Sequence, residues 1–262
     1  MEDIFSLKDK IIVVTGGSGN LGTEFTNTLI DCEAKVVVLD ILADEKQSNS
    51  NLRYFKIDIT KKDQIQSCLE TLKQDWGSPF GLINNAGLDS PPNSNAQSNV
   101  SFENFSDSDW DNIMEVNLKG SYYCSQIIGS EMAKNNSGSI ININSLYGNL
   151  SPDQRLYSHI DNSGEKFFKP FAYGASKSGL ANLTKYLATY WAKNNVRVNT
   201  MTLGGVYNNQ DKEFVKKYIH KVPMGRMANT NDFSGALIFL LSDSASYVTG
   251  ADIVIDGGFS AW

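Results

Sequence analysis

The sequence predicts a doubly wound α/β fold, with one mainly parallel sheet of about seven strands and helices on both faces. Short β-branched runs, such as those at 11–14 and 35–39, are typical of strands buried on both sides of a parallel sheet. Segments with apolar residues at helical spacing alternate with these runs. The length of 262 residues suits one large domain, so we expect a single domain over 1–262.

Charge and cysteine content exclude several classes of partner. The net charge is −6 without a Lys/Arg cluster, which argues against nucleic acid as a partner. Cys32, Cys68 and Cys124 lie far apart and lack metal-ligand spacing, so we expect reduced thiols and no metal. The acidic N-terminus lacks a long apolar run, and no segment approaches the ~20 apolar residues of a membrane helix. We therefore expect a cytoplasmic protein with no membrane partner.

A glycine-rich turn connects the first predicted strand to the first predicted helix. The strand covers 11–14, the turn covers 15–22 and the helix covers about 24–30. This order is typical of dinucleotide binding, because glycines let the backbone approach a pyrophosphate that sits on the helix amides. The turn residues expected to bind the cofactor are Gly16, Ser18, Gly19, Asn20, Leu21 and Gly22.

The second predicted strand, at 35–39, ends in Asp40. A carboxylate there can accept both ribose hydroxyls of adenosine and would repel a 2′-phosphate. Ile41 follows it, and the glycine turn contains no Arg or Lys that could hold such a phosphate. The pattern favours NAD(H) over NADP(H), although an Asp that only caps the next turn is an alternative.

The central part of the chain continues the alternation of strands and helices. A third strand is expected at 53–58, a helix at 62–76, and a fourth strand at 81–83 that leads into Asn84-Asn85-Ala86-Gly87. The segment 88–106 is rich in Ser, Asn and Pro, which predicts an exposed loop. This loop either overhangs a substrate at the sheet edge or is a surface insertion.

The second half of the chain carries residues suited to proton transfer. A long helix that residues 107–110 could cap contains Asn117, and the fifth strand, at 139–145, ends in Ser145. Tyr173 and Lys177 lie one turn apart on a helix expected from 172 to about 193. A nearby ammonium favours the phenolate form of tyrosine. A sixth strand at 196–201, a helix at 231–241 and a last strand at 253–255 complete the prediction.

Over essentially its whole length, the chain resembles the short-chain dehydrogenase/reductase superfamily. The matching motifs are the glycine turn, Asp40, Asp58, Asn84-Asn85-Ala86-Gly87, Asn117, Ser145, Tyr173 with Lys177, and Asp256-Gly257-Gly258. The resemblance implies a Rossmann-type fold and an NAD-dependent oxidoreductase that moves a hydride between the nicotinamide and a secondary alcohol or ketone.

The resemblance also implies roles for individual residues. Tyr173 would exchange the proton, Lys177 would lower its pKa and hold the nicotinamide ribose, and Ser145 would position the reacting oxygen. Asn117 would support a water chain, its carbonyl freed by a local helix distortion; a buried Asn satisfied by backbone is the alternative. Further cofactor contacts are expected from Asp58, Ile59, Asn85, Ala86, Gly87, Tyr173, Lys177, Gly204 and Val206.

The chain departs from the family pattern in three places. The interval between Ser145 and Tyr173 is unusually long, so residues 150–169 are expected to form a flap at the substrate edge. Within the flap, Arg155, His159 and Lys166 could meet an anionic or sugar substrate, or simply be solvated. Asn20 replaces a common glycine, and we expect it to use the left-handed conformation that Asn tolerates. Asn208 replaces a common threonine, which puts a pyrophosphate contact there in doubt.

Several functional alternatives remain open. The flap, together with residues 204–211 and a tail ending in Trp, resembles superfamily members from bacterial surface-glycan and nonulosonate pathways, which suggests a sugar or nucleotide-sugar substrate. The alternatives are a 3-oxoacyl thioester or other small-ketone reductase, an epimerase or dehydratase that retains NAD, and a non-enzymatic NAD(H)-sensing protein. Residues 212–221 resemble a mobile lid, and pairing of the 172–193 helix with its copy would make a homodimer or homotetramer.

Overall fold

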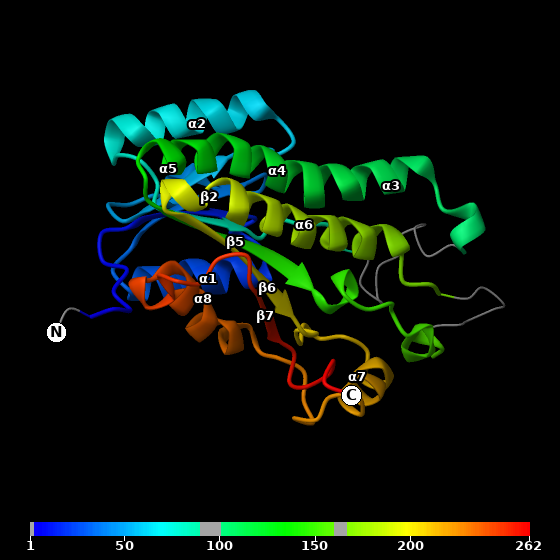
Figure 1. Cartoon of the computed structure of the whole chain (residues 1–262). Helices are drawn as coiled ribbons and strands as arrows, with labels where there is room; N and C mark the ends of the chain where they lie inside the picture. Colours follow the sequence, from blue (N-terminus) through cyan, green and yellow to red (C-terminus); the bar gives the residue numbers. More distant parts are fainter. Residues whose placement is uncertain (1–2, 90–100, 160–166) are drawn as a thin grey trace.

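The computed structural model describes residues 3–89, 101–159 and 167–262, and its strands form one parallel sheet (Figure 1). The strand order is β3-β2-β1-β4-β5-β6-β7. The strands are β1 Ile11–Thr15, β2 Lys35–Asp40, β3 Leu52–Lys56, β4 Gly81–Asn84, β5 Gly138–Ser145, β6 Val196–Leu203 and β7 Asp252–Ile255. The predicted doubly wound α/β fold is confirmed.

The strand order reverses beside β1, which pairs with β2 on one side and β4 on the other. The chain first builds outward through β2 and β3, then crosses back to place β4 on the opposite edge of β1. Loops that leave β1 and β4 therefore diverge and open a crevice at the carboxyl ends of these strands. In open α/β sheets, this switch point is where ligands bind.

Helices cover both faces of the sheet (Figure 1). One face carries α1 Asn20–Asp31 and α8 Ser234–Leu241, which contact each other. The opposite face carries α2 Lys62–Asp75, α3 Asp107–Met114, α4 Ser121–Cys124, α5 Ser130–Lys134 and α6 Phe171–Tyr190. A smaller helix, α7 Lys212–Ile219, packs beyond the ends of the strands near the C-terminus.

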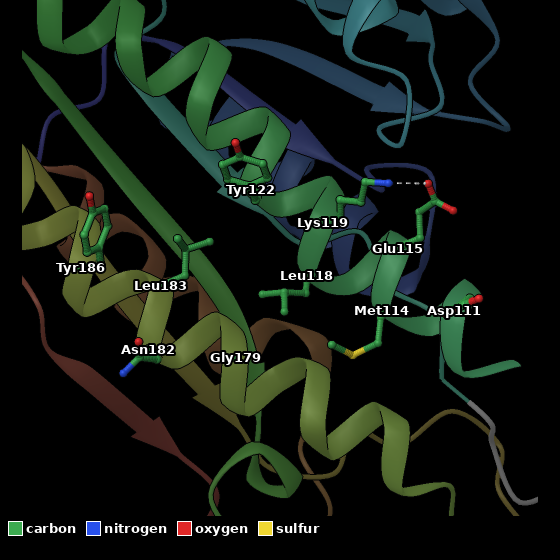
Figure 2. Close-up of a pocket in the computed structure, with 10 residues that line it drawn as sticks. All are labelled: Asp111, Met114, Glu115, Leu118, Lys119, Tyr122, Gly179, Asn182, Leu183 and Tyr186. Carbon is green, nitrogen blue, oxygen red and sulfur yellow. Dashed lines mark hydrogen bonds and ion pairs between the residues drawn. The ribbon is translucent and has the colours of Figure 1, made fainter. Parts of the chain in front are cut away.

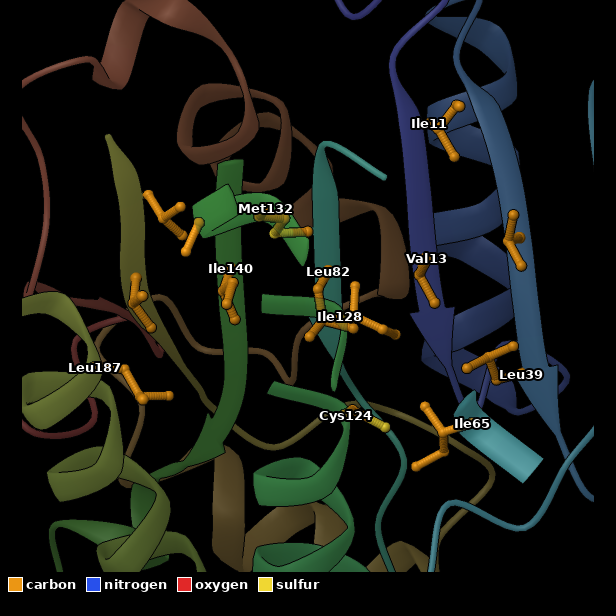
Figure 3. Close-up of a cluster of buried hydrophobic side chains, with 14 of the residues drawn as sticks. Ile11, Val13, Leu39, Ile65, Leu82, Cys124, Ile128, Met132, Ile140 and Leu187 are labelled. Carbon is orange, nitrogen blue, oxygen red and sulfur yellow. The ribbon is translucent and has the colours of Figure 1, made fainter. Parts of the chain in front are cut away.

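Alternation along the strands produces the two-sided core. Ile11 and Val13 face the cluster that Figure 3 shows, whereas Ile12 and Val14 belong to the cluster on the other face. Successive strand side chains point to opposite faces, so a strand buried on both sides must be continuously apolar. The β-branched runs in the sequence therefore reflect helices on both faces.

Residues 107–134 form one long helical rod with two π-helical segments, Glu115–Gly120 and Ser125–Gly129. The predicted helix distortion around Asn117 is confirmed, since Asn117 lies in the first π segment. The predicted cap is wrong by one residue. Ser106 caps α3, because its hydroxyl accepts a hydrogen bond from the amide of Asp109 at 3.1 Å.

Other boundaries shift slightly from the prediction. The strand β3 ends at Lys56, so Asp58 lies in the turn that follows rather than in the strand. The helix α6 ends at Tyr190 rather than near 193, and the chain reverses through Asn195 in the left-handed region, with φ of 53°. Element ends are set by local hydrogen bonds that the apolar pattern does not encode.

The flap packs on α7. Leu156, Tyr157 and Phe167 of the flap form a buried cluster with Phe214 and Tyr218 of α7. Residues 90–100 of the expected loop and 160–166 of the flap, including Lys166, lie outside the described part of the chain. Within the described part, no helix is both long and apolar enough to cross a membrane.

Candidate active site

A cavity of about 900 Å³ opens at the switch point between β1 and β4. The predicted site residues that border it are Gly16, Gly19, Asn20, Leu21, Gly22, Asp40, Asp58, Ile59, Asn85, Ala86, Gly87, Ser145, Tyr173, Lys177, Gly204 and Val206. Ser18 and Asn117 do not border it. Residues from both halves of the chain therefore meet around one space.

Two glycines of the turn lie against backbone and cannot carry a side chain. A Cβ on Gly22 would lie 2.1 Å from the carbonyl oxygen of Gly16. A Cβ on Gly16, whose φ is +64°, would lie 2.8 Å from the Cα of Ala86. The turn, the first helical turn of α1 and the segment after β4 are therefore in direct backbone contact, which leaves a smooth surface for a ligand.

The amino end of α1 is available for an anion. Its N-cap is Gly19, which has no side-chain cap, and no acidic residue occupies the first turn. The first amides of a helix lack partners within the helix and carry its positive dipole end, so they suit a pyrophosphate.

Asn20 does not adopt the left-handed conformation that we expected. It is the first residue of α1, and it is absent from the described non-glycine residues with positive φ. The prediction was wrong because helix formation begins at this position, where any side chain with negative φ is tolerated. The Asn20 side chain instead adds an exposed polar group at the cavity border.

Backbone amides hold the Asp40 carboxylate in place. One oxygen accepts from the amide of Ser18 at 3.0 Å, and the other accepts from the amide of Leu42 at 2.8 Å. Asp40 therefore caps the next turn, and its contact with a ribose stays a prediction for a carboxylate that borders the cavity. Ser18 contributes through its backbone, behind the carboxylate that it orients.

Thr15, which we did not select from the sequence, ties the two diverging segments together. Its hydroxyl accepts from the amides of Asn85 and Ala86, each at 3.0 Å. The Asn85 side chain donates back to the carbonyls of Thr15 and Gly16 at 3.0 and 3.1 Å. Thr15 is the last residue of β1 and directly precedes the glycine turn, and this position is the signal that could have identified it.

Asp58 completes the far end of the cavity. One of its carboxylate oxygens accepts from both the amide and the hydroxyl of Thr60, at 2.9 and 2.8 Å. These contacts hold the Asp58 side chain at the cavity border next to Ile59. Glycines that exclude side chains, free helix amides and two oriented carboxylates together fit a dinucleotide.

Tyr173 and Lys177 project from α6 into the middle of the cavity. The Lys177 ammonium lies 5.8 Å from the centre of the Tyr173 ring and donates to the carbonyl of Ile143 at 2.8 Å. Ser145, at the end of β5, forms a side-chain hydrogen bond with Tyr173. The three predicted catalytic side chains that border the cavity are therefore close to one another.

Burial dominates the electrostatics of this group. Burial lowers the pKa of Lys177 to about 8, and the charge of Asp89 opposes this shift. Burial raises the pKa of Tyr173, and the charge of Asp89 raises it further. The pKa of Tyr173 is therefore raised overall, and the lowering expected from Lys177 stays a prediction. The hydrogen bond from Ser145 is the contact that acts in the lowering direction.

Asn117 lies buried beneath this group, with its side chain fully engaged. Its Oδ1 accepts from the amide of Leu88 at 2.7 Å, and its Nδ2 donates to the Leu88 carbonyl and to the Ser176 hydroxyl. The Asn117 side chain is therefore a buried amide whose hydrogen bonds are made mainly to backbone, as in the alternative interpretation. The Asn117 carbonyl accepts from the Ser121 hydroxyl at 2.9 Å, and its role in a water chain stays a prediction.

The substrate end of the cavity contains residues that the sequence did not reveal. Asp89 and Lys169 form an ion pair with a separation of 2.5 Å, and the hydroxyls of Tyr147 and Tyr157 lie 3.2 Å apart. All four residues border the cavity with Tyr173. Asp89 lies far in sequence from the other three, which fall between 147 and 169, and no local pattern connects the four.

Two flap residues that we considered for substrate contact lie elsewhere. Arg155 is 87% exposed and pairs with Asp153 at 2.9 Å. His159 Nε2 lies 3.1 Å from an oxygen of Asp211, at the start of α7. Neither borders the cavity, so their interactions support the flap itself.

A second hollow of about 760 Å³ lies on the outer face, between the long helical rod and α6 (Figure 2). Leu118, Tyr122 and Tyr186 are among its lining residues. None of the predicted catalytic or cofactor-binding residues lines it. Glu115 lines both this hollow and the switch-point cavity.

Comparisons with known proteins show which family the chain resembles. Residues 18–260 match the family described as enoyl-(acyl carrier protein) reductase. The chain is 31% identical to the NAD-dependent glycerol dehydrogenase of Listeria innocua, over 98% of this chain and 96% of the relative. It is 29% identical to the NADP-dependent mannitol dehydrogenase of Hypocrea jecorina, over 98% and 95%.

A solved structure has the same overall fold. It is the short chain dehydrogenase from Leptospira borgpetersenii with bound NAD+, which is 31% identical. The match has a TM-score of 0.85 and covers 99% of this chain and 96% of the other.

Proposed function

Since the chain belongs to the short-chain dehydrogenase/reductase superfamily, we propose that it is an NAD-dependent oxidoreductase that interconverts a secondary alcohol and a ketone in a single domain. The observation that carries this proposal is the meeting of Ser145, Tyr173 and Lys177 in the same cavity as the glycine turn and Asp40. A neutral sugar alcohol and its ketose form the substrate pair that we favour, because glycerol and mannitol dehydrogenases are among the relatives.

The mechanism follows from the positions of the side chains. The nicotinamide ring, when bound, accepts the hydride from the alcohol carbon or returns it. Ser145 and Tyr173 hydrogen-bond the substrate oxygen, and during oxidation the deprotonated form of Tyr173 takes the proton. Because burial raises the pKa of Tyr173, it holds its proton at neutral pH and is well suited to donate it during ketone reduction. Lys177, held by the Ile143 carbonyl, stabilises the phenolate that forms during proton transfer.

The cofactor occupies the other half of the cavity in this proposal. The glycine turn and the first amides of α1 would hold the pyrophosphate, and Asp40 would accept the adenosine ribose hydroxyls. The other residues that would complete the cofactor site are Asp58, Ile59, Asn85, Ala86, Gly87, Gly204 and Val206. The Asp40 carboxylate favours NAD(H), because it would repel a 2′-phosphate.

The test is the reduced-nicotinamide absorbance when the purified protein and NAD+ receive glycerol, D-mannitol, galactitol, nucleotide sugars or hydroxyacyl thioesters. We expect turnover with a polyol. Turnover with thioesters alone would favour the 3-oxoacyl reductase alternative. NADH binding without turnover of any alcohol would contradict the proposal and favour the sensing protein.

We also propose that the protein is a cytoplasmic homodimer or homotetramer that associates through the outer face of α6 and the helical rod. Tyr186, which lines the hollow in Figure 2, stacks on Tyr190, and the two side chains are 60% and 65% exposed. Light scattering of the wild type and of Tyr186→Asp with Tyr190→Asp tests it. We expect the double variant to be monomeric, and a monomeric wild type would contradict the proposal.

A further inference from the structure

We propose that Asp89 and Lys169 form a subsite that binds the hydroxyl groups on the carbons next to the reacting carbon of a neutral polyol. This inference rests on the proposed function and assigns its substrate selectivity to one ion pair. Asp89 follows the Asn84–Gly87 motif, and Lys169 lies directly before α6, so the pair bridges the two segments that flank Tyr173. Both residues border the cavity.

The two members of the pair differ in their exposure. The Lys169 side chain is only 4% exposed, and its ammonium lies 5.4 Å from the centre of the Tyr173 ring. The Asp89 side chain is 43% exposed. Lys169 Nζ contacts Oδ1 of Asp89, and no hydrogen bond to Oδ2 is found within the described part of the chain. The pair therefore presents a carboxylate edge to the cavity, fixed by a buried cation.

Such an arrangement recognises hydroxyl groups. A carboxylate accepts hydrogen bonds from two neighbouring hydroxyls, and an ammonium donates to a hydroxyl oxygen. The phenol groups of Tyr147 and Tyr157 add further donors and acceptors on the same side of Tyr173. A secondary alcohol without neighbouring hydroxyls cannot satisfy these groups, and a site with unpaired polar groups rejects such substrates strongly.

The charge at this end favours a neutral substrate. Asp89 forms an ion pair with Lys169, and its carboxylate is the more exposed member of the pair. A sugar acid would place its carboxylate near Asp89 and meet a repulsive charge. The subsite therefore selects sugar alcohols and ketoses over sugar acids.

The experiment compares kcat/KM for D-mannitol, galactitol and glycerol with that for butan-2-ol, which has one secondary hydroxyl and no neighbour. The variants are Asp89→Asn, Lys169→Met and the double variant. We compare variants by the ratio of kcat/KM for the best polyol to kcat/KM for butan-2-ol. Any effect of a variant on Tyr173 cancels in this ratio, because both alcohols transfer their proton to Tyr173. We expect the ratio to fall roughly 10- to 100-fold in each single variant, the range for lost hydrogen bonds to charged groups.

Controls separate selectivity from folding. NADH binding by fluorescence and the Tm show whether each variant is folded, and the double variant removes both members of the ion pair together. Arg155→Gln changes an exposed flap cation that does not border the cavity, and we expect its ratio to equal that of the wild type.

The possible results distinguish the subsite from the proposed function. A wild type that prefers polyols, with a ratio that falls in Asp89→Asn and in the double variant, supports the subsite. An unchanged ratio in folded variants overturns the subsite but leaves the oxidoreductase intact, as does a wild type that shows no preference for polyols. A wild type that oxidises no alcohol overturns the proposed function, and the subsite with it.

Discussion

The two ends of the switch-point cavity are built in different ways. The cofactor end consists mainly of backbone: glycines whose Cβ atoms would clash, free helix amides and strand ends, with Asp40 held by two amides. The substrate end consists of side chains, including Asp89, Tyr147, Tyr157 and Lys169, drawn from separate segments. A substitution changes side chains and leaves the backbone in place, so under the proposed function substitutions at the side-chain end would alter substrate choice more readily than cofactor binding.

The largest expected effect comes from Tyr173, where the two ends meet. Tyr173→Phe keeps the ring and removes the proton donor, so we expect kcat to fall by roughly 10²–10⁴-fold, the usual range for general acid–base catalysis. NADH affinity, measured by fluorescence, should change little. Near-normal turnover in this variant would contradict the assignment of Tyr173.

A second variant tests whether the cofactor end depends on backbone contact. In Gly22→Ala, the new Cβ would lie 2.1 Å from the Gly16 carbonyl oxygen, so the turn must move. We expect a loss of roughly 1–3 kcal/mol in unfolding free energy, typical of overpacking, together with weaker NADH binding. Gly235→Ala is the control, because its Cβ would have no neighbour within 4 Å in α8. Equal behaviour of the two variants would refute the contact argument.

Lys177 links stability to pH at the junction. Burial lowers its pKa from 10.5 to about 8, so the folded state bears the cost of the buried charge below pH 8. Between pH 8 and 10.5 the unfolded chain binds the extra proton, and the stability of the wild type rises with pH. Lys177→Met removes this cost, so we expect up to about 3 kcal/mol more stability at pH 7.

The measurement for Lys177→Met is chemical denaturation across pH 6–11, beside an activity assay. The advantage of the variant should shrink between pH 8 and 10.5, while its activity is largely lost. A constant difference in stability across this range would show that Lys177 is not a buried cation.

The smallest effect is expected at Asp40, whose carboxylate lies at the rim of the cofactor end. Asp40→Asn removes the charge and keeps the shape, so we expect kcat/KM with NAD+ to fall roughly tenfold, as for a lost hydrogen bond to a charged group. The ratio of NADP+ to NAD+ use should rise. Asp44→Asn, at a nearby exposed turn, is the charge-matched control. An unchanged ratio at Asp40 would remove it from the basis of NAD selectivity.

Much of the fold and the cofactor end could be predicted from local sequence. The β-branched runs at 11–14 and 35–39 became β1 and β2, and the glycine turn, Asp40, Ser145, Tyr173 and Lys177 came together at one edge of the sheet. Parallel strands all end on the same side, so motifs at strand ends must converge whatever lies between them. Asn20 was misjudged because the start of α1, rather than the residue type, determines its backbone conformation.

The sequence by itself determined the α/β class and predicted which motifs meet at the switch-point cavity, because these depend on short-range patterns and on where strands end. Only the tertiary structure decided that His159 lies beside Asp211, that Lys169 pairs with Asp89, and that burial raises the pKa of Tyr173. Pairing and desolvation depend on which distant segments pack together, and no local pattern contains that information. The residues of the proposed substrate end could therefore be identified only in the folded structure, whereas those of the proposed cofactor end could be predicted from sequence motifs.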